Sequence, residues 1–197
     1  MEKRGGGKVR KITAFLPMLL SLSLILIPAV LAAPGSTGSS AAKLLAMTRR
    51  ATDKYHDVSV ALADGYVPMS PCDEIDGAAM GMHYVNLGLA SDMVVNEVTP
   101  EILLFVDTDE GPKLVGVEYF VAAVGTDGAF VGPLFDMTLP AGWIWLTPAP
   151  TLFEVSMDGP MEPHAAGVMP WHFDLHVWLW HGNPDGMFAE FNPALKC

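Results

Sequence analysis

The segment 171–178, WHFDLHVW, carries two imidazoles and a carboxylate at alternating positions. Alternate side chains of a β-strand point to opposite faces, so in a strand His172, Asp174 and His176 share one face. Imidazole and carboxylate groups are ligands for Zn, Fe, Mn or Cu. Strand positions two apart lie about 6.5–7 Å apart at Cα, so three such residues rarely reach one ion, and we expect a ligand from another strand.

Two residues elsewhere in the chain complete the candidate site. His83 lies in an expected short strand, and Glu118 stands in a long apolar run, where a charge must be exposed, paired or liganded. The best constellation is therefore His83, Glu118 and His176 as metal ligands. In this reading His172 and Asp174 either join the ligands or orient them and transfer protons. A histidine–carboxylate set with an open position supports metal-assisted chemistry.

The donor types also rank the metals. Zn, Fe or Mn fit the histidine–carboxylate set first, and copper comes second because thioethers stand near histidines in the sequence. The alternative is that methionine only fills irregular cores. The residues that suggest copper are Met80, Met82 and His83, together with Met157, Met161, His164 and Met169.

A metal-free binding module for a small or carbohydrate-like ligand is the main alternative. Trp178 and Trp180 continue the expected face of the histidines, and Tyr119 follows the buried acid in the sequence. Aromatic rings beside polar groups are typical of a binding pocket. Ordinary core and edge packing is the alternative for these rings. A third hypothesis is a structural cell-envelope protein with no small-molecule site. Whether it is an enzyme stays open, although a serine nucleophile is not supported, because the chain lacks a G-x-S-x-G motif.

The charge distribution excludes two classes of partner. The chain has 11 basic and 22 acidic residues, and five of the basic ones lie within the first 33 residues. The remaining sequence holds 6 basic and 21 acidic residues, a net charge of −15. Such a surface repels phosphate backbones and anionic lipid, so we expect neither nucleic-acid binding nor peripheral membrane docking.

One long helix is expected ahead of the β-rich part. It begins at a cap formed by Ser39 or Ser40 and ends near Gly65, after which prolines prevent its continuation. Its apolar positions recur every three or four residues, which predicts one buried stripe. The stripe consists of Leu44, Met47, Ala51, Tyr55, Val58 and Leu62.

Beyond residue 80 the sequence changes to strand patterns. A short strand is expected at 82–87, and the apolar runs 101–107 and 113–124 flank turn residues, which predicts a β-hairpin. The segment 133–170 contains seven prolines and predicts a long loop, a candidate lid, before a strand at 173–180. We therefore expect an α+β fold, with one N-terminal helix packed on a mainly antiparallel β-sheet or a small β-barrel.

The N-terminus is typical of a secretory leader. Residues 1–32 combine a basic start, an apolar stretch and small residues at the exit, so we expect a signal peptide cleaved after Ala32. A flexible linker at 33–40 and a single domain at 41–197 follow. The alternative is an uncleaved N-terminal membrane anchor. Either reading places the domain outside the cytoplasm, secreted or in the cell envelope.

The two cysteines, Cys72 and Cys197, fit that compartment. An even pair in an oxidising environment usually forms a bridge, so we expect a disulfide between them. The alternative is two free thiols. The two cysteines are far apart in the sequence and do not form the Cys-x-x-Cys motif of a redox-active pair.

Three pieces of the sequence resemble a group of short exported bacterial proteins. They are GMHYVN at 81–86, VEY at 117–119, and HVW at 176–178 with NPDGMF at 183–188. The resemblance covers most of residues 45–197. It implies export but no activity, cofactor, partner or site residue.

Overall fold

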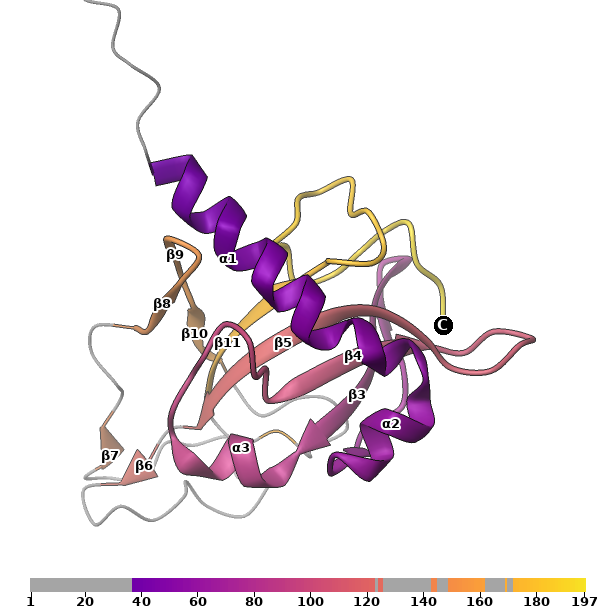
Figure 1. Cartoon of the computed structure of the whole chain (residues 1–197), viewed down its shortest axis with the longest axis horizontal. Coiled ribbons are helices and arrows are strands. Elements are labelled where there is room, and N and C mark those ends of the chain that lie inside the picture. Colours follow the sequence, from indigo (N-terminus) through magenta and orange to yellow (C-terminus); the bar gives the residue numbers. More distant parts are fainter. Residues whose placement is uncertain (1–36, 123, 126–142, 145–148, 162–168, 170–171) are drawn as a thin grey trace, which may run out of the picture. The chain divides into compact units, whose positions relative to one another are not determined.

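The computed structural model describes residues 37–122, 124–125, 143–144, 149–161, 169 and 172–197. Its centre is an antiparallel β-sheet with the strand order β1-β3-β4-β5-β11-β10, to which β2 adds by pairing with β3 (Figure 1). Two two-stranded sheets, β6-β7 and β8-β9, are separate from this sheet. The fold class is α+β, as predicted, and the described strands form an open sheet rather than a closed barrel. The sheet strands are β1 (Tyr66–Pro68), β2 (Asp73–Ile75), β3 (Ala78–Asn86), β4 (Ile102–Val106), β5 (Lys113–Ala122), β10 (Asp158–Met161) and β11 (His172–Val177).

The expected long helix is present but interrupted, so the prediction of one continuous helix is wrong. It divides into α1 (Thr37–Thr52), the 3₁₀-helix η1 (Asp53–His56) and α2 (Val58–Ala63). Asp57 breaks it, because its backbone is extended and its carboxylate accepts the N–H of Ser59, which caps a new helix. Two residues of the predicted apolar stripe are exposed: Leu62 in α2 at 47%, and Met47, ahead of the break in α1, at 43%.

The start of α1 overlaps the predicted linker. The helix begins at Thr37, ahead of the expected cap at Ser39 or Ser40, so the last four linker residues are helical. The expected signal peptide at 1–32 and the linker residues up to 36 lie outside the described residues. In the described part of the chain, no helix is long and apolar enough to cross a membrane.

The hairpin prediction is confirmed by β4 and β5, which pair antiparallel. Their register contains a bulge: Leu104 pairs with Gly116 and Phe105 with Leu114, which leaves Val115 unpaired on β5. A bulge of this kind inserts one residue and shifts the alternation of faces. Because of it Val115 packs on the opposite side of the sheet from Val117, although two positions normally restore the same face.

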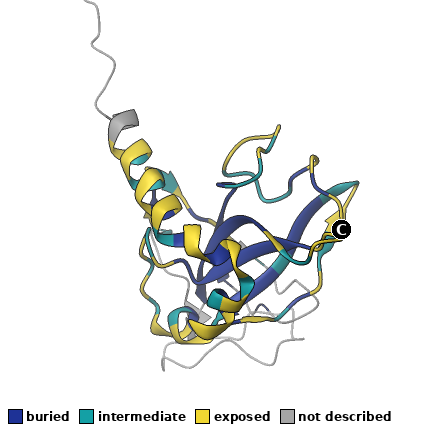
Figure 2. Cartoon of the chain, turned by 45° about the vertical axis from the view of Figure 1, so that its right-hand side comes forward, coloured by how far each residue is buried: buried dark blue, intermediate teal, exposed yellow. Residues whose placement is uncertain are grey.

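The two faces of the sheet carry separate apolar clusters. The first, here called the helix-side core, includes Leu103, Val117 and Leu175, with residues of α1 and α2 packed against it. The second, here called the site-side core, includes Ile102 and Leu104 and is covered by residues of the C-terminal segment. The central strands are therefore buried on both faces, as Figure 2 shows in dark blue. This explains why their sequences read as continuous apolar runs.

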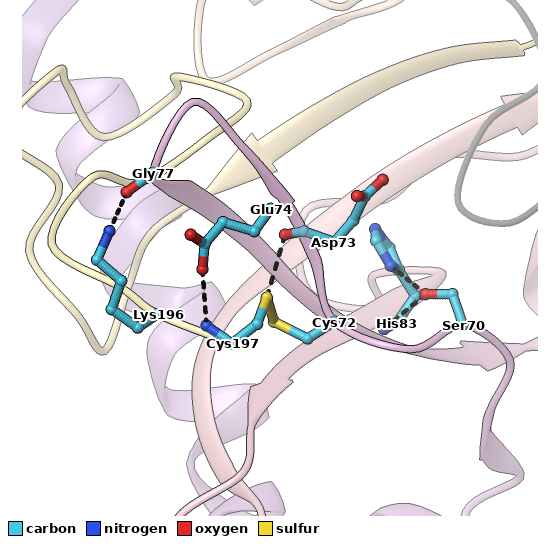
Figure 3. Close-up of a disulfide and its surroundings, with 8 residues drawn as sticks. All are labelled: Ser70, Cys72, Asp73, Glu74, Gly77, His83, Lys196 and Cys197. Atoms are coloured by element: carbon cyan, nitrogen blue, oxygen red, sulfur yellow. Dashed lines mark hydrogen bonds between the residues drawn. A yellow bond between two sulfur atoms is a disulfide. The ribbon is translucent and has the colours of Figure 1, made fainter.

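The predicted disulfide between Cys72 and Cys197 is confirmed, with a Cα–Cα distance of 5.5 Å. It joins the C-terminal segment to the chain just ahead of β2 (Figure 3). Around it the backbone N–H of Cys197 donates to Glu74, and Lys196 donates to the carbonyl of Gly77. The C-terminal segment is thus fixed against the β2–β3 hairpin.

Other expected elements fall partly outside the described residues. The expected strand at 143–147 is represented by β7 (Trp143–Ile144), which pairs with β6 (Val124–Gly125). Within the proline-rich segment the structure describes β8 (Thr151–Leu152), β9 (Val155–Ser156) and the edge strand β10. Residues 133–142, 145–148, 162–168 and 170 of the candidate lid lie outside the described part. A short helix, α3 (Leu87–Asp92), follows β3 directly and is capped by Asn86.

Candidate metal centre

Three strands contribute one donor each to a cluster on the site-side face. His83 lies on β3, Glu118 on β5 and His176 on β11. Glu118 pairs directly with His176 across β5 and β11, while β4 lies between β3 and β5. The apolar neighbours of each donor alternate with it and pack on the helix side. Strand alternation therefore turns all three donors toward the same side of the sheet.

The donor atoms converge closely. The Nε2 atom of His83 lies 3.1 Å from Oε2 of Glu118, and Nε2 of His176 lies 3.5 Å from the same oxygen. The donor atoms of the three residues all lie within 4.8 Å of one another. Nitrogen and oxygen ligands of a tetrahedral zinc ion, at about 2.0–2.2 Å from it, are themselves about 3.3 Å apart. The predicted convergence of His83, Glu118 and His176 is thus confirmed, and the cluster can hold a metal ion.

Burial makes this cluster costly without a compensating charge. The three side chains are at most 2% exposed. Among the described residues, neither oxygen of Glu118 nor the Nε2 atoms of His83 and His176 have a hydrogen-bond partner of good geometry, although they lie close together. No lysine or arginine of the described chain forms an ion pair with Glu118. An imidazolium or a bound cation must therefore balance the buried carboxylate.

The pKa of Glu118 also depends on the neighbouring imidazoles. Burial by itself raises the pKa of a carboxyl group. The positive charge that His176 and His83 can carry outweighs this burial and lowers the pKa of Glu118 below its ordinary value. The carboxylate is therefore stabilised while the imidazoles carry charge, and a metal ion that binds here must displace their protons.

His172 and Asp174 extend the cluster along β11. Nε2 of His172 lies 3.4 Å from Oδ2 of Asp174, and the same oxygen is 4.0 Å from Nδ1 of His176. Both residues are buried. Asp174 sits behind His176, on the ring nitrogen that does not face Glu118. At 4.0 Å it is not hydrogen-bonded to the imidazole.

The three aromatic residues expected to form a stacking wall do not gather at one site. Trp178 is buried beside His176, with ring centroids 6.3 Å apart, and its indole N–H donates to the carbonyl of Ala189. Tyr119 belongs to the helix-side core, because it neighbours Glu118 on one strand and so faces the other way. Trp180 also packs on the helix side, where the guanidinium of Arg49 lies 4.9 Å from its ring centroid.

Trp180 faces the opposite side of the sheet from the side predicted, because β11 ends at Val177. Beyond it the chain turns, and the backbone N–H groups of Trp180 and His181 both donate to the carbonyl of Val115, the bulge residue. The strand expected to run to residue 180 therefore stops three residues early. A strand pattern cannot be extended through such a turn, so the predicted face of Trp180 is wrong.

The methionines expected to favour copper divide between locations. Met82 packs with the helix-side core, on the face away from its neighbour His83. Met80 is buried, and Met157 belongs to the helix-side core. His164 lies outside the described residues. Met82 and Met157 therefore do not join the three-donor cluster.

Sequence reasoning missed two buried polar residues near the cluster. Ser70 lies on the segment between β1 and β2, and its Oγ is 2.6 Å from Nδ1 of His83. Glu101 is 1% exposed, and its carboxyl group accepts the backbone N–H of Phe120. A serine ahead of a cysteine carries no distinctive signal. Glu101, however, opens an apolar run as Glu118 interrupts one, and the same rule on buried charge applies to both.

Comparison with known proteins gives no further guidance. The chain matches no family model, no curated protein and no solved structure. Its function is therefore inferred from the site itself.

Proposed function

We propose that this protein is exported and binds one divalent transition-metal ion through His83, Glu118 and His176. The observation that carries the proposal is the convergence of three buried donors from three strands within 4.8 Å. An acid without a lysine or arginine partner in the described chain, between two imidazoles, matches the chemistry of a cation site better than that of a packed core.

The donor set favours particular metals. Two imidazole nitrogens and one carboxylate oxygen suit zinc, iron or manganese, with copper as the second choice. Calcium takes six to eight oxygen ligands, and magnesium usually keeps several waters, so neither fits a buried set with two nitrogen donors. We therefore place Zn²⁺, Fe²⁺ and Mn²⁺ ahead of the other common cations.

Three protein donors also leave a coordination position for water or a substrate, which is the arrangement of catalytic zinc sites. A divalent ion held by these three residues would supply Lewis-acid chemistry, which activates water as a nucleophile. The carboxylate of Asp174 and the imidazole of His172 continue from His176 along β11 and can accept or relay a proton. A metal-dependent activity would use these groups, while metal binding alone requires only the three donors.

Export is supported by the leader-like residues 1–32 and by the disulfide, which is typical of an oxidising compartment. The resemblance to short exported bacterial proteins stays a prediction that agrees with this location. N-terminal sequencing of the protein recovered outside the cytoplasm should begin at Ala33. A sequence that begins at Met1 would instead favour the anchored form.

Metal analysis of the protein purified without a tag tests the binding proposal. We expect about one ion per chain after incubation with Zn²⁺, Fe²⁺ or Mn²⁺. A free ion at 100 times its dissociation constant should raise the free energy of unfolding by about 2.7 kcal/mol. Glu118→Gln, which keeps the shape and removes the charge, and His176→Ala should abolish both effects. The exposed His56, changed to Gln, is the matched control and should bind like the wild type.

The outcomes separate the readings. Wild-type protein that retains less than about a tenth of an ion per chain, with an unchanged melting temperature in every metal, overturns the proposal. Equal metal content in the wild type and in Glu118→Gln overturns the assignment of this site, whatever the metal.

A further inference from the structure

Ser70 contacts the ring nitrogen of His83 that faces away from Glu118. Its Oγ lies 2.6 Å from Nδ1 of His83, and the same oxygen accepts the backbone N–H of His83 at 3.3 Å. Both residues are buried. The ring of His83 is therefore held between a hydroxyl group on one side and a carboxylate on the other (Figure 3 shows the hydroxyl side).

The chemistry of imidazole makes this contact consequential. A neutral imidazole has one N–H, and a nitrogen that binds a metal must present its lone pair. When Nε2 of His83 binds an ion, Nδ1 must carry the proton and needs an acceptor, which Ser70 provides. A hydroxyl group can also donate, so Ser70 can satisfy Nδ1 when the proton resides on Nε2. Partners of this kind usually fix the tautomer and the orientation of metal-binding histidines.

Ser70 is itself firmly placed. The backbone N–H of the preceding residue, Met69, donates to the carbonyl of His83 at 2.9 Å, so this segment runs beside β3 as a continuation of β1. Two residues after Ser70, Cys72 forms the disulfide with Cys197. The position of the hydroxyl is thus fixed on one side by β3 and on the other by the covalent bridge.

The other histidine of the cluster, His176, has a more distant partner at its Nδ1 atom. Nδ1 of His176 is 4.0 Å from the carboxylate of Asp174, beyond hydrogen-bond distance. His83 is therefore the better anchored of the two imidazoles.

We propose that Ser70 is a positioning residue that accepts the Nδ1 proton of His83 and so presents Nε2 to the metal ion. This inference rests on the proposed metal binding and assigns the group that sets the tautomer of one ligand. Ser70 does not touch the ion. It acts through His83, and the disulfide keeps it in reach.

Zinc affinity and the ring-nitrogen signals of His83 test the role of Ser70. We expect Ser70→Ala to weaken Zn²⁺ binding by about 10- to 100-fold, the usual cost of losing such a partner. Ser70→Thr, which retains the hydroxyl, should recover most of that affinity. Ser91→Ala removes an exposed hydroxyl that bonds only locally to the carbonyl of Gly88 and should bind like the wild type. In zinc-loaded wild-type protein, ¹⁵N NMR should show His83 protonated at Nδ1 and coordinated through Nε2.

Each outcome tests a separate statement. Wild-type protein that binds none of Zn²⁺, Fe²⁺, Mn²⁺ and Cu²⁺ overturns the proposed function, and with it the role given to Ser70. Zinc binding of equal strength in the wild type and in Ser70→Ala, at equal thermal stability of the metal-free proteins, overturns only the role of Ser70. Coordination of the zinc ion through Nδ1 of His83 would also overturn only the role of Ser70. Loss of affinity in Ser70→Ala with recovery in Ser70→Thr supports it.

Discussion

Replacing Glu101 by glutamine should remove a large loss of stability that the wild type suffers as the pH rises. Glu101 lies just ahead of β4, is 1% exposed, and accepts the backbone N–H of Phe120 at 3.1 Å. Burial raises the pKa of its carboxyl group to about 8, and the N–H of Phe120 opposes that rise only in part. In the folded protein at neutral pH this carboxyl group is therefore protonated.

The size of the effect follows from the two pKa values. Between an ordinary value of 4.5 and about 8, the folded protein retains a proton that the unfolded chain has lost. The free energy of unfolding therefore falls by about 1.4 kcal/mol per pH unit, about 5 kcal/mol over the range. The stabilisation that the protonated Glu101 gives the folded protein is complete below pH 4.5 and is lost above about pH 8. Glutamine carries no charge and lacks this fall, although its extra donor costs about 1–3 kcal/mol if unpaired.

Urea unfolding of both proteins with the disulfide intact, from about pH 5 to pH 9, provides the measurement. Glu101→Gln should be less stable than the wild type at the acid end and more stable at the alkaline end. The exposed Glu110, changed to Gln, should follow the wild type throughout. Parallel stability profiles for the wild type and Glu101→Gln would refute the reasoning, since they would mean that Glu101 ionises alike in both states.

Two further predictions concern the frame around the site. Serine at both Cys72 and Cys197 should lower the free energy of unfolding by about 5 kcal/mol in the chain-entropy estimate, because the bridge spans 125 residues. Equal urea midpoints for the oxidised wild type and the double variant would contradict this. Gly116→Ala should destabilise by about 1–3 kcal/mol, since the added Cβ would lie 2.8 Å from a carbonyl oxygen at the end of β11. Gly182→Ala, with open space at that position, is its control, and equal melting temperatures for the two variants would show that β11 can shift away.

Much of the site could be predicted because strand alternation is a local rule. Glu118 interrupts an apolar run, and His176 alternates with apolar residues, so both were expected to face one side of a sheet. Antiparallel pairing of β5 with β11 then places them opposite each other. The disulfide between Cys72 and Cys197 followed from residue type and compartment alone.

The errors arose where one residue changes the local geometry. Asp57 can cap a helix or lie within one, and the sequence does not show that it starts a new helix at Val58. The bulge at Val115 depends on the partner strand, which no single-strand pattern contains. The turn after Val177 uses the carbonyl freed by that bulge, and this moves Trp180 to the other face. Ser70 is placed by tertiary contacts and could not be singled out beforehand.

The three donors of the cluster are arranged across the strands rather than along one of them. Their spacing is therefore set by the lateral repeat of the sheet, about 4.8 Å per strand, which backbone hydrogen bonds keep nearly constant. A metal site built on loops can widen to admit a larger ion. This site cannot widen in the same way, because that would break backbone hydrogen bonds between neighbouring strands from β3 to β11. We expect size exclusion to contribute to selectivity, with small ions of low coordination number admitted and wide, highly coordinated ions refused.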